Sequence, residues 1–317
     1  MKTAQESAMA RSGRNPIHSF DPNILAHLHV DATGAAARVE KICKTRMPKK
    51  EHQAAWLKAA VTMIDLTTLE GADTPGKLER LGAKGLRPIP DDPGVRVAAL
   101  CVYGNLVERA KKILQGTPIK VAAVSTSFPH GQTPLPIKIE ETKALVAAGA
   151  DEIDMVISRN AFLTGDYYRV YEEIAEIREA CGEAHLKVIL ETGEIGELKN
   201  VWVAGEIAMQ AGADFIKTST GKINPAATME VGLIMLNAIN EFHRRGGVKI
   251  GMKPAGGIRS AKQSLQWLAL VKETLGDEWL TPELFRLGAS GLLDDIGRQL
   301  HHLETGQYES YDYIPKG

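Results

Sequence analysis

The sequence of 317 residues predicts a (β/α)8 TIM barrel with an N-terminal helical extension. Eight short apolar runs of strand composition alternate with longer segments of helical period. Such alternation implies parallel strands, and nearly unbroken apolar runs imply strands that are covered on both faces. Eight such units suit a closed barrel better than an open, doubly wound sheet, which is the alternative architecture for this pattern.

Three regions are expected along the chain. Residues 1–50 are polar and predict a partly flexible extension, followed by one or two helices that cover one end of the domain. Residues 51–300 are expected to form the catalytic barrel, and residues 301–317 a C-terminal tail. The predicted strands are, in order, 61–69, 95–103, 120–128, 151–157, 186–192, 214–220, 248–255 and 284–290.

Helical periodicity is clearest between the later strands. Apolar side chains fall on one face over 165–181 and again over 225–245. Pro225 is expected to open the second of these helices, and the pair Gly246–Gly247 to close it.

An internal sequence repeat supports the barrel prediction. The segments 146–157 (VAAGADEIDMVI) and 209–220 (MQAGADFIKTST) share a helix end, a Gly-Ala-Asp turn and a strand, and they lie 63 residues apart, about two βα units. This register places Asp154 opposite Lys217. Because alternate strands of a barrel contribute to the same interior layer, the carboxylate and the amine are expected to point into one cavity.

Bulk composition limits the partners and the compartment. A formal net charge of -1 argues against a nucleic-acid or anionic-membrane surface, and no apolar run is long enough to span a membrane. The N-terminus lacks the apolar core of a signal peptide, and three scattered cysteines indicate a reducing, cytoplasmic setting. No motif with metal-ligand spacing occurs, so neither a metal nor another cofactor is expected.

Two lysines within apolar strand segments carry the main functional hypothesis. Lys217 follows Phe215 and Ile216, and Lys253 follows Ile250 and Met252. A buried amine must be paired or lose its proton, and a neutral amine is a nucleophile toward carbonyls. Schiff-base chemistry is therefore favoured over the alternative, in which each lysine reaches solvent or forms a structural ion pair with Asp154.

Glycine-bearing turns follow the last three predicted strands. They are STGK (219–222), PAGG (254–257) and GASG (288–291), and their backbone N–H groups suit a phosphate. Asp65, Thr67 and Thr68 end the first strand, where they either orient Lys253 or the substrate, or support the loops. Three further residues have separate expected roles: Cys101 is a packing residue, Lys187 a stabilising residue away from the catalytic end, and Glu191 a weaker site candidate.

The motifs FIKTSTGK and GMKPAGGIR, with the strands IDLTTL and EIDMVI, resemble the deoxyribose-phosphate aldolase family over about residues 54–289. The longer animal-type members are the most similar. The resemblance implies a metal-free class I aldolase that reversibly cleaves 2-deoxy-D-ribose 5-phosphate to acetaldehyde and D-glyceraldehyde 3-phosphate. Another Schiff-base aldolase or transaldolase, or a non-catalytic sugar-phosphate-binding barrel, remains as the alternative. Homo-oligomers, dimeric or tetrameric, are compatible with the sequence.

The resemblance also implies roles for individual residues. Lys217 would form the Schiff base, Lys253 would depress its pKa, and Asp154 would relay protons. Asp65 would hold the lysine pair. Residues that would bind the substrate are Asp65, Thr67 and Thr220 for the sugar, with Gly221, Gly256, Gly257, Ser290 and Gly291 for the phosphate.

The sequence departs from the family pattern at two positions, and it does not determine the role of the C-terminal tail. Gly291 stands where bacterial members have a serine, and Gly104 where a proline is usual. The family uses a tyrosine near a flexible C-terminus to assist proton transfer. Tyr308, Tyr311 and Tyr313 are the candidates, and a disordered tail with no such role is the alternative.

Overall fold

The computed structural model describes residues 14–49, 51–90 and 92–310, which contain a barrel of eight parallel strands. Each strand from β1 to β6 pairs with the next along the chain, and β1 also pairs with β8. Two isolated bridges, Met252 with Phe285 and Ala255 with Gly288, join the remaining edges. The barrel prediction is confirmed, and the open-sheet alternative is wrong. The strands are β1 (Ile64–Thr67), β2 (Ala99–Val102), β3 (Lys120–Val124), β4 (Glu152–Val156), β5 (His185–Ile189), β6 (Phe215–Lys217), β7 (Gly251–Lys253) and β8 (Leu287–Ala289).

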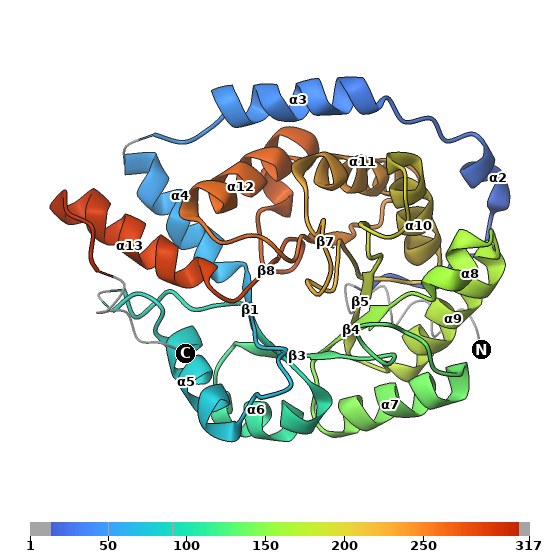
Figure 1. Cartoon of the computed structure of the whole chain (residues 1–317), viewed down its shortest axis with the longest axis horizontal. Coiled ribbons are helices and arrows are strands. Elements are labelled where there is room, and N and C mark those ends of the chain that lie inside the picture. The colour runs from blue at the N-terminus through green and yellow to red at the C-terminus, as the bar shows by residue number, and fades with distance from the viewer. Residues whose placement is uncertain (1–13, 50, 91, 311–317) are drawn as a thin grey trace.

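Helices form a ring around the strands (Figure 1). Those that follow strands are α5 (Pro75–Leu86), α6 (Val107–Ile113), α7 (Leu135–Ala147), α8 (Arg159–Leu163), α9 (Tyr167–Ala180), α10 (Leu198–Gln210), α11 (Met229–Gly246), α12 (Ala261–Leu275) and α13 (Leu292–Thr305). Ahead of the barrel come α2 (Pro22–Ala26), α3 (Ala32–Thr45) and α4 (Glu51–Thr62), and two short 3-10 helices are η1 (Gly104–Leu106) and η2 (Asp277–Trp279).

Most predicted strands were longer than the observed ones, and two predicted boundaries were wrong for a clear local reason. The first predicted strand began at residue 61, but Val61 and Thr62 complete α4, so the strand starts at Ile64. Pro225 does not open α11. The helix begins at Met229, because the Thr228 side chain accepts a hydrogen bond from the Val231 amide and satisfies an otherwise free N–H.

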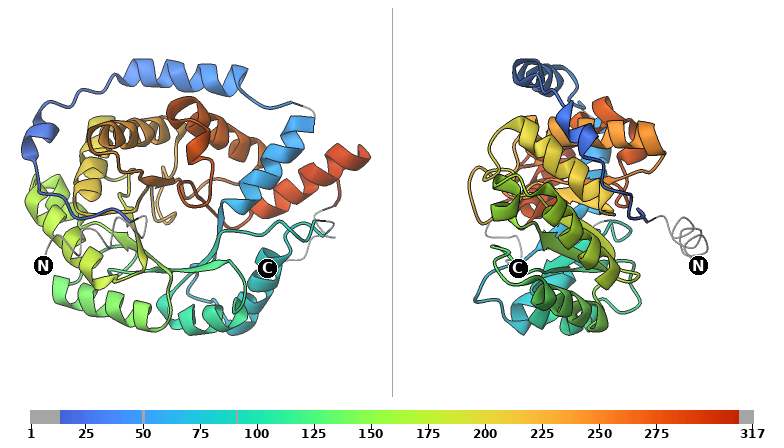
Figure 2. Two further views of the ribbon diagram at one scale, coloured as in Figure 1. Left: turned by 180° about the vertical axis from the view of Figure 1, so that it is seen from behind. Right: turned by 90° about the vertical axis from the view of Figure 1, so that its right-hand side faces the viewer.

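The N-terminal extension differs from the expected pair of end-covering helices. α3 packs on the outside of the ring against α11 and α12 (Figures 1 and 2). An end of the barrel is instead met by Arg14 and Asn15. Arg14 donates to the carbonyl of Ala184 at 2.5 Å, and Asn15 donates through Nδ2 to the carbonyl of Ala213 at 3.0 Å. These carbonyls lie one residue before β5 and two residues before β6, so the extension is anchored at the N-terminal end of the barrel.

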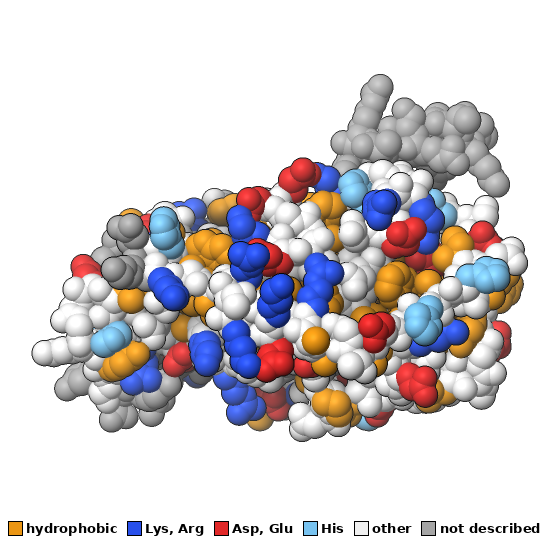
Figure 3. Space-filling view, turned by 90° about the horizontal axis from the view of Figure 1, so that it is seen from above, with side chains coloured by type: hydrophobic (Ala, Val, Ile, Leu, Met, Phe, Trp, Pro, Cys, Tyr) orange, Lys and Arg blue, Asp and Glu red, His pale blue; other side chains and the backbone are white. Residues whose placement is uncertain are grey.

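The outer surface carries charges of both signs. Figure 3, seen from the side on which α3 lies, shows Lys and Arg side chains interspersed with Asp and Glu, and with a few histidines. Among the helices that the structure describes, none combines the length and hydropathy needed to cross a membrane.

Candidate active site

A cluster of charged side chains fills the interior of the barrel. Asp154 Oδ2 accepts hydrogen bonds from Lys217 Nζ and Lys253 Nζ, each at 2.7 Å. Lys253 Nζ also lies 2.6 Å from Asp65 Oδ2. All four side chains are buried. The two lysines therefore depend on the same carboxylates for hydrogen bonds that water would provide to an exposed lysine.

Strand alternation directs these side chains inward. On β4, Asp154 faces the interior, whereas Ile153 and Met155 belong to the apolar core beneath the helices. Lys217 and Lys253 are the last residues of β6 and β7, and they are register partners. The amines therefore lie toward the carboxyl ends of the strands, where barrels place their chemistry.

The packing below the lysines depends on one glycine. A Cβ added to Gly251 would lie 2.3 Å from Cε1 of Phe215, so the Phe215 ring occupies the space of the missing side chain. This ring is also the neighbour of two cations: Lys187 Nζ lies 5.9 Å and Arg286 Cζ 5.8 Å from its centroid. An aromatic ring in this position stabilises positive charge below the two lysines.

The electrostatic surroundings distinguish the two lysines. Burial lowers the pKa of Lys217; the Lys253 charge lowers it further, and Asp154 opposes both without overcoming them. Burial also acts to lower the pKa of Lys253, but Asp154 and Asp65 outweigh it and raise that pKa well above its usual value. Lys217 is therefore the amine that is more easily neutral, and Lys253 is a fixed cation beside it.

Asp154 is held as a carboxylate. Burial alone would raise its pKa, but Lys187, Lys217 and Lys253 together lower that pKa well below its usual value. The Cys101 thiol lies 4.0 Å from Asp154 Oδ2, and burial raises its pKa. Cys101 is therefore a protonated neighbour of the cluster, which agrees with its expected packing role.

Two expectations about neighbouring residues were wrong. Asp65 was expected to hold both lysines, but in the structure it contacts Lys253 and, at 3.9 Å, Lys187. Lys187 was expected to lie apart from the catalytic end. Its Nζ instead donates to Asp154 Oδ1 at 3.1 Å, because Lys187 on β5 is the register partner of Asp154 on the neighbouring strand β4.

Glu152 and Arg286 were missed by sequence reasoning. Arg286 Nη2 donates to Glu152 Oε1 at 2.8 Å, and Nη1 donates to Asp65 Oδ1 at 2.6 Å. Glu152 also accepts from Lys187. A signal was present, since Arg286 lies between Phe285 and Leu287, and Glu152 lies two residues before Asp154 on the same face of a strand.

The glycine turns lie together beyond the ends of β6 and β7. Gly221, Gly256 and Gly257 have φ of 78°, 84° and 81°, the left-handed conformation that glycine adopts without strain. A Cβ on Gly256 would come within 2.6 Å of Ala226 Cβ and 3.0 Å of Gly221 Cα. Gly257 is exposed, as are Ser290 and Gly291, which precede α13.

Two threonines named with the site have different neighbours. Thr67 is half-buried, and its hydroxyl donates to the carbonyl of Asp65 at 2.8 Å. The Thr220 amide donates to Glu191 Oε1 at 3.1 Å, and its hydroxyl also donates to that carboxylate. Glu191 has a φ of 55° and is fully buried, so this weaker candidate anchors the turn after β6.

Lys222 and Tyr308 occupy places that the sequence did not indicate. Lys222 Nζ reaches across the barrel mouth to Glu70 Oε1 at 3.0 Å. Tyr308 stacks on His302, with ring centroids 4.0 Å apart, and its hydroxyl donates to Gln299 Oε1 at 3.1 Å. Tyr308 therefore lies against α13 rather than in the barrel interior. Tyr311 and Tyr313 lie outside the described residues.

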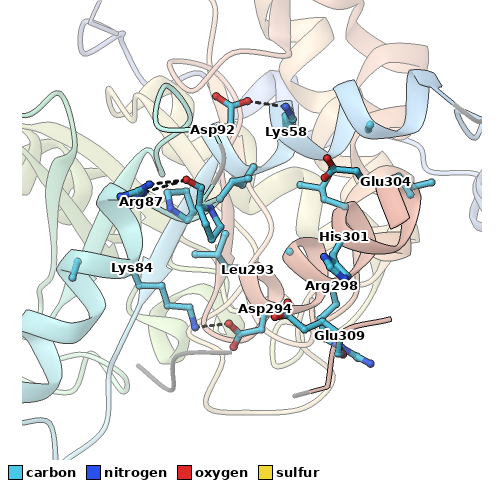
Figure 4. A pocket seen from close by; sticks show the side chains of 18 of the residues that line it. Lys58, Lys84, Arg87, Asp92, Leu293, Asp294, Arg298, His301, Glu304 and Glu309 are labelled. Atoms are coloured by element: carbon cyan, nitrogen blue, oxygen red, sulfur yellow. Dashed lines mark hydrogen bonds and ion pairs between the residues drawn. The ribbon is translucent and has the colours of Figure 1, made fainter. Parts of the chain in front are cut away.

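A separate cavity of about 830 Å³ lies outside the strands between α4, α5 and α13. Figure 4 shows Lys84 directed toward Asp294 and Lys58 toward Asp92, and these pairs lie 2.5 Å and 2.7 Å apart. Its lining contains none of the interior lysines. Among the described residues, no group of three or more His, Cys, Asp or Glu could hold a metal ion.

Comparison with known proteins identifies the family. Residues 59–293 match the DeoC/LacD family of aldolases. The chain belongs to this aldolase family. Proteins named deoxyribose-phosphate aldolase from mouse and from human are each 51% identical to it; the alignments cover 93% and 96% of this chain, and 96% and 99% of the relatives.

Solved structures agree with the fold of this aldolase. The aldolase QR15 is 27% identical, with a TM-score of 0.63 over 77% of this chain and 96% of that one. The tetrameric deoxyribose phosphate aldolase of Aeropyrum pernix, 22% identical, shares the fold with a TM-score of 0.60 over 82% of this chain and 100% of that one.

Proposed function

We propose that this aldolase cleaves 2-deoxy-D-ribose 5-phosphate to acetaldehyde and D-glyceraldehyde 3-phosphate through a Schiff base on Lys217, and that it also runs the reverse condensation. The observation that carries the proposal is the shared Asp154 oxygen, which lies 2.7 Å from both Lys217 and Lys253 in the barrel interior. A neutral amine beside a fixed ammonium and a carboxylate is the arrangement that carbonyl addition by lysine requires.

The reaction begins at the substrate aldehyde carbon, C1. Lys217 Nζ adds to C1, and loss of water leaves an iminium. A base then removes the C3 hydroxyl proton, and the C2–C3 bond breaks. The electron pair of this bond forms the C1–C2 double bond while the iminium π electrons move to nitrogen, which gives an enamine and glyceraldehyde 3-phosphate. Protonation of the enamine at C2 and hydrolysis of the new iminium release acetaldehyde and free Lys217.

Asp154 is the proposed proton relay for these steps. Its low pKa makes it a weak base by itself, so we assign it the role of orienting a water that takes and returns the proton. Lys253 supplies the positive charge that keeps Lys217 deprotonated. The dry interior strengthens both effects, because opposing and like charges interact more strongly at low dielectric.

The phosphate is proposed to bind at the glycine turns. Gly221, Gly256 and Gly257 present backbone without side chains near the ends of β6 and β7, and Ser290 and Gly291 precede the N-terminus of α13. We assign sugar contacts to Thr67 at the end of β1, to Thr220 in the turn after β6, and to Asp65, which is buried in the interior.

The compartment is proposed from the cysteines. Cys43, Cys101 and Cys181 are all free thiols in the structure, and Cys101 and Cys181 are buried. Free thiols of this kind favour a reducing compartment, and we propose the cytoplasm.

Reductive trapping tests the proposal. Incubation with deoxyribose 5-phosphate and cyanoborohydride should leave a stable secondary amine on the peptide that contains Lys217, detected by mass spectrometry. Lys217→Arg should abolish both the adduct and turnover, whereas Lys143→Ala, at an exposed lysine paired with Glu140, should change neither. Preferential turnover of fructose phosphates would favour a transaldolase or another aldolase, and an adduct on a different lysine would contradict the assignment of Lys217.

A further inference from the structure

The interior charges do not balance if every group is ionised. Four cations (Lys187, Lys217, Lys253, Arg286) face three carboxylates (Asp65, Glu152, Asp154), and none of the seven residues is more than 5% exposed. One excess positive charge in a dry interior is costly. The cluster reaches neutrality when a single lysine loses its proton.

The contacts determine which lysine that is. Lys253 is paired with Asp65 and Asp154, and Arg286 with Asp65 and Glu152. Lys187 is paired with Glu152 and Asp154 and, at 3.9 Å, with Asp65, so each of these cations has at least two carboxylate partners. Among the described residues, Lys217 has one carboxylate partner, Asp154, which it shares with both other lysines. Deprotonation therefore costs the least Coulomb energy at Lys217.

We propose that Arg286 is a positioning residue whose permanent charge, held by Asp65 and Glu152, makes Lys217 the neutral amine of the cluster. This inference rests on the proposed function. Arg286 occupies carboxylate oxygens that would otherwise be available to the lysines, and a guanidinium does not lose its proton in proteins. It does not touch Lys217 but acts through Asp65, Lys253 and Asp154.

Among the described residues, the Arg286 guanidinium contacts two carboxylates and, through Nε, the carbonyl of Pro282. Its guanidinium lies over the Phe215 ring at 5.8 Å, with Glu152 from β4 and Asp65 from β1 as its carboxylate contacts. Lys187 on β5 completes the cations of the cluster, and the Cys101 thiol on β2 lies 4.0 Å from Asp154 Oδ2. Neutral Arg286 variants would remove the excess charge, and neutral Glu152 variants would double it.

The test measures the pH midpoint of trapping, which is the pH at which acetaldehyde and cyanoborohydride modify half of the Lys217 side chains. Arg286→Gln should raise this midpoint by about one pH unit, because Lys217 can then keep its proton in a neutral cluster. Glu152→Gln should lower it by a similar amount. The double variant Arg286→Gln/Glu152→Gln restores the original excess charge and should return the midpoint toward that of the wild type, and Arg286→Lys should stay near it.

Loss of packing alone would reduce the amount of folded protein, followed by circular dichroism, without moving the midpoint. Unshifted midpoints, or shifts of the same sign in the two single variants, would overturn the inference. If Arg286→Gln does not fold, Glu152→Gln decides by itself, and an unchanged or raised midpoint would then refute it. Wild-type protein that forms no adduct at Lys217 would instead refute the proposed function.

Discussion

Lys217 and Lys253 are register partners on neighbouring strands, and both donate to the same oxygen of Asp154 at 2.7 Å. One carboxylate oxygen cannot fully compensate two buried ammonium groups. Lys253 has Asp65 as a second partner, 2.6 Å away, whereas Lys217 has no second carboxylate partner in the part of the chain that the structure describes. The inequality between two chemically identical side chains thus comes from the placement of Asp65 on β1.

Replacing Lys253 with leucine should make Lys217 harder to deprotonate. Lys253 is one of the charges that lower the pKa of Lys217, and its loss also frees Asp154 to stabilise the Lys217 ammonium. We expect kcat/KM at neutral pH to fall by about 100-fold or more, with partial recovery at higher pH. The measurement is the pH profile of turnover.

The control for this variant is Lys143→Ala, which removes an exposed lysine. A Lys253→Leu profile that is lowered at every pH without shifting would remove Lys253 from its assigned role.

Replacing Asp154 with asparagine should separate stability from adduct formation. The amide keeps the shape but leaves Lys187, Lys217 and Lys253 without a shared carboxylate, so the free energy of unfolding at pH 7 should fall by about 3–5 kcal/mol. Asp154 raises the pKa of Lys217, so its loss should let Lys217 form the adduct at lower pH while C2–C3 cleavage is lost. Urea unfolding and reductive trapping measure the two effects.

The same variant has a defined pH dependence. The folded pKa of Asp154 lies well below its usual value, so its contribution to stability is present above the unfolded pKa of about 3.9 and is lost as pH falls through the folded pKa. The difference in stability between wild type and Asp154→Asn should therefore shrink below about pH 4. A difference that stays constant down to acid unfolding would contradict this account.

Sequence periodicity was sufficient for the barrel and for the opposition of Asp154 and Lys217, because both follow from local alternation repeated along the chain. It was insufficient for Arg286 and Glu152. These two residues contact each other across 134 residues of chain, and a lone arginine in an apolar segment does not reveal which carboxylate it will contact. The helix start predicted at Pro225 was wrong for a local reason: Thr228, three residues later, provides the helix cap.

Replacing Gly256 with alanine should weaken phosphate binding. At a φ of 84° a side chain is strained, and the added Cβ would lie 2.6 Å from that of Ala226. We expect KM for deoxyribose 5-phosphate to rise at least tenfold while kcat changes less, and the free energy of unfolding to fall by about 1–3 kcal/mol. Gly246→Ala is the matched control, because its Cβ would meet nothing within 4 Å. Similar KM values for the two variants would argue against a phosphate site at this turn.

Replacing Tyr308 with phenylalanine should leave kcat within about twofold of the wild type. The Tyr308 hydroxyl donates to Gln299 on α13, its ring stacks on His302, and the side chain is 57% exposed, so it meets none of the interior lysines. Steady-state turnover and solvent proton exchange at C2 of acetaldehyde measure its role in proton transfer. The prediction that a tail tyrosine assists this transfer then depends on Tyr311 and Tyr313, and Tyr311→Phe and Tyr313→Phe are the matched comparisons. A tenfold loss of exchange in Tyr308→Phe would mean that this residue leaves α13 during turnover.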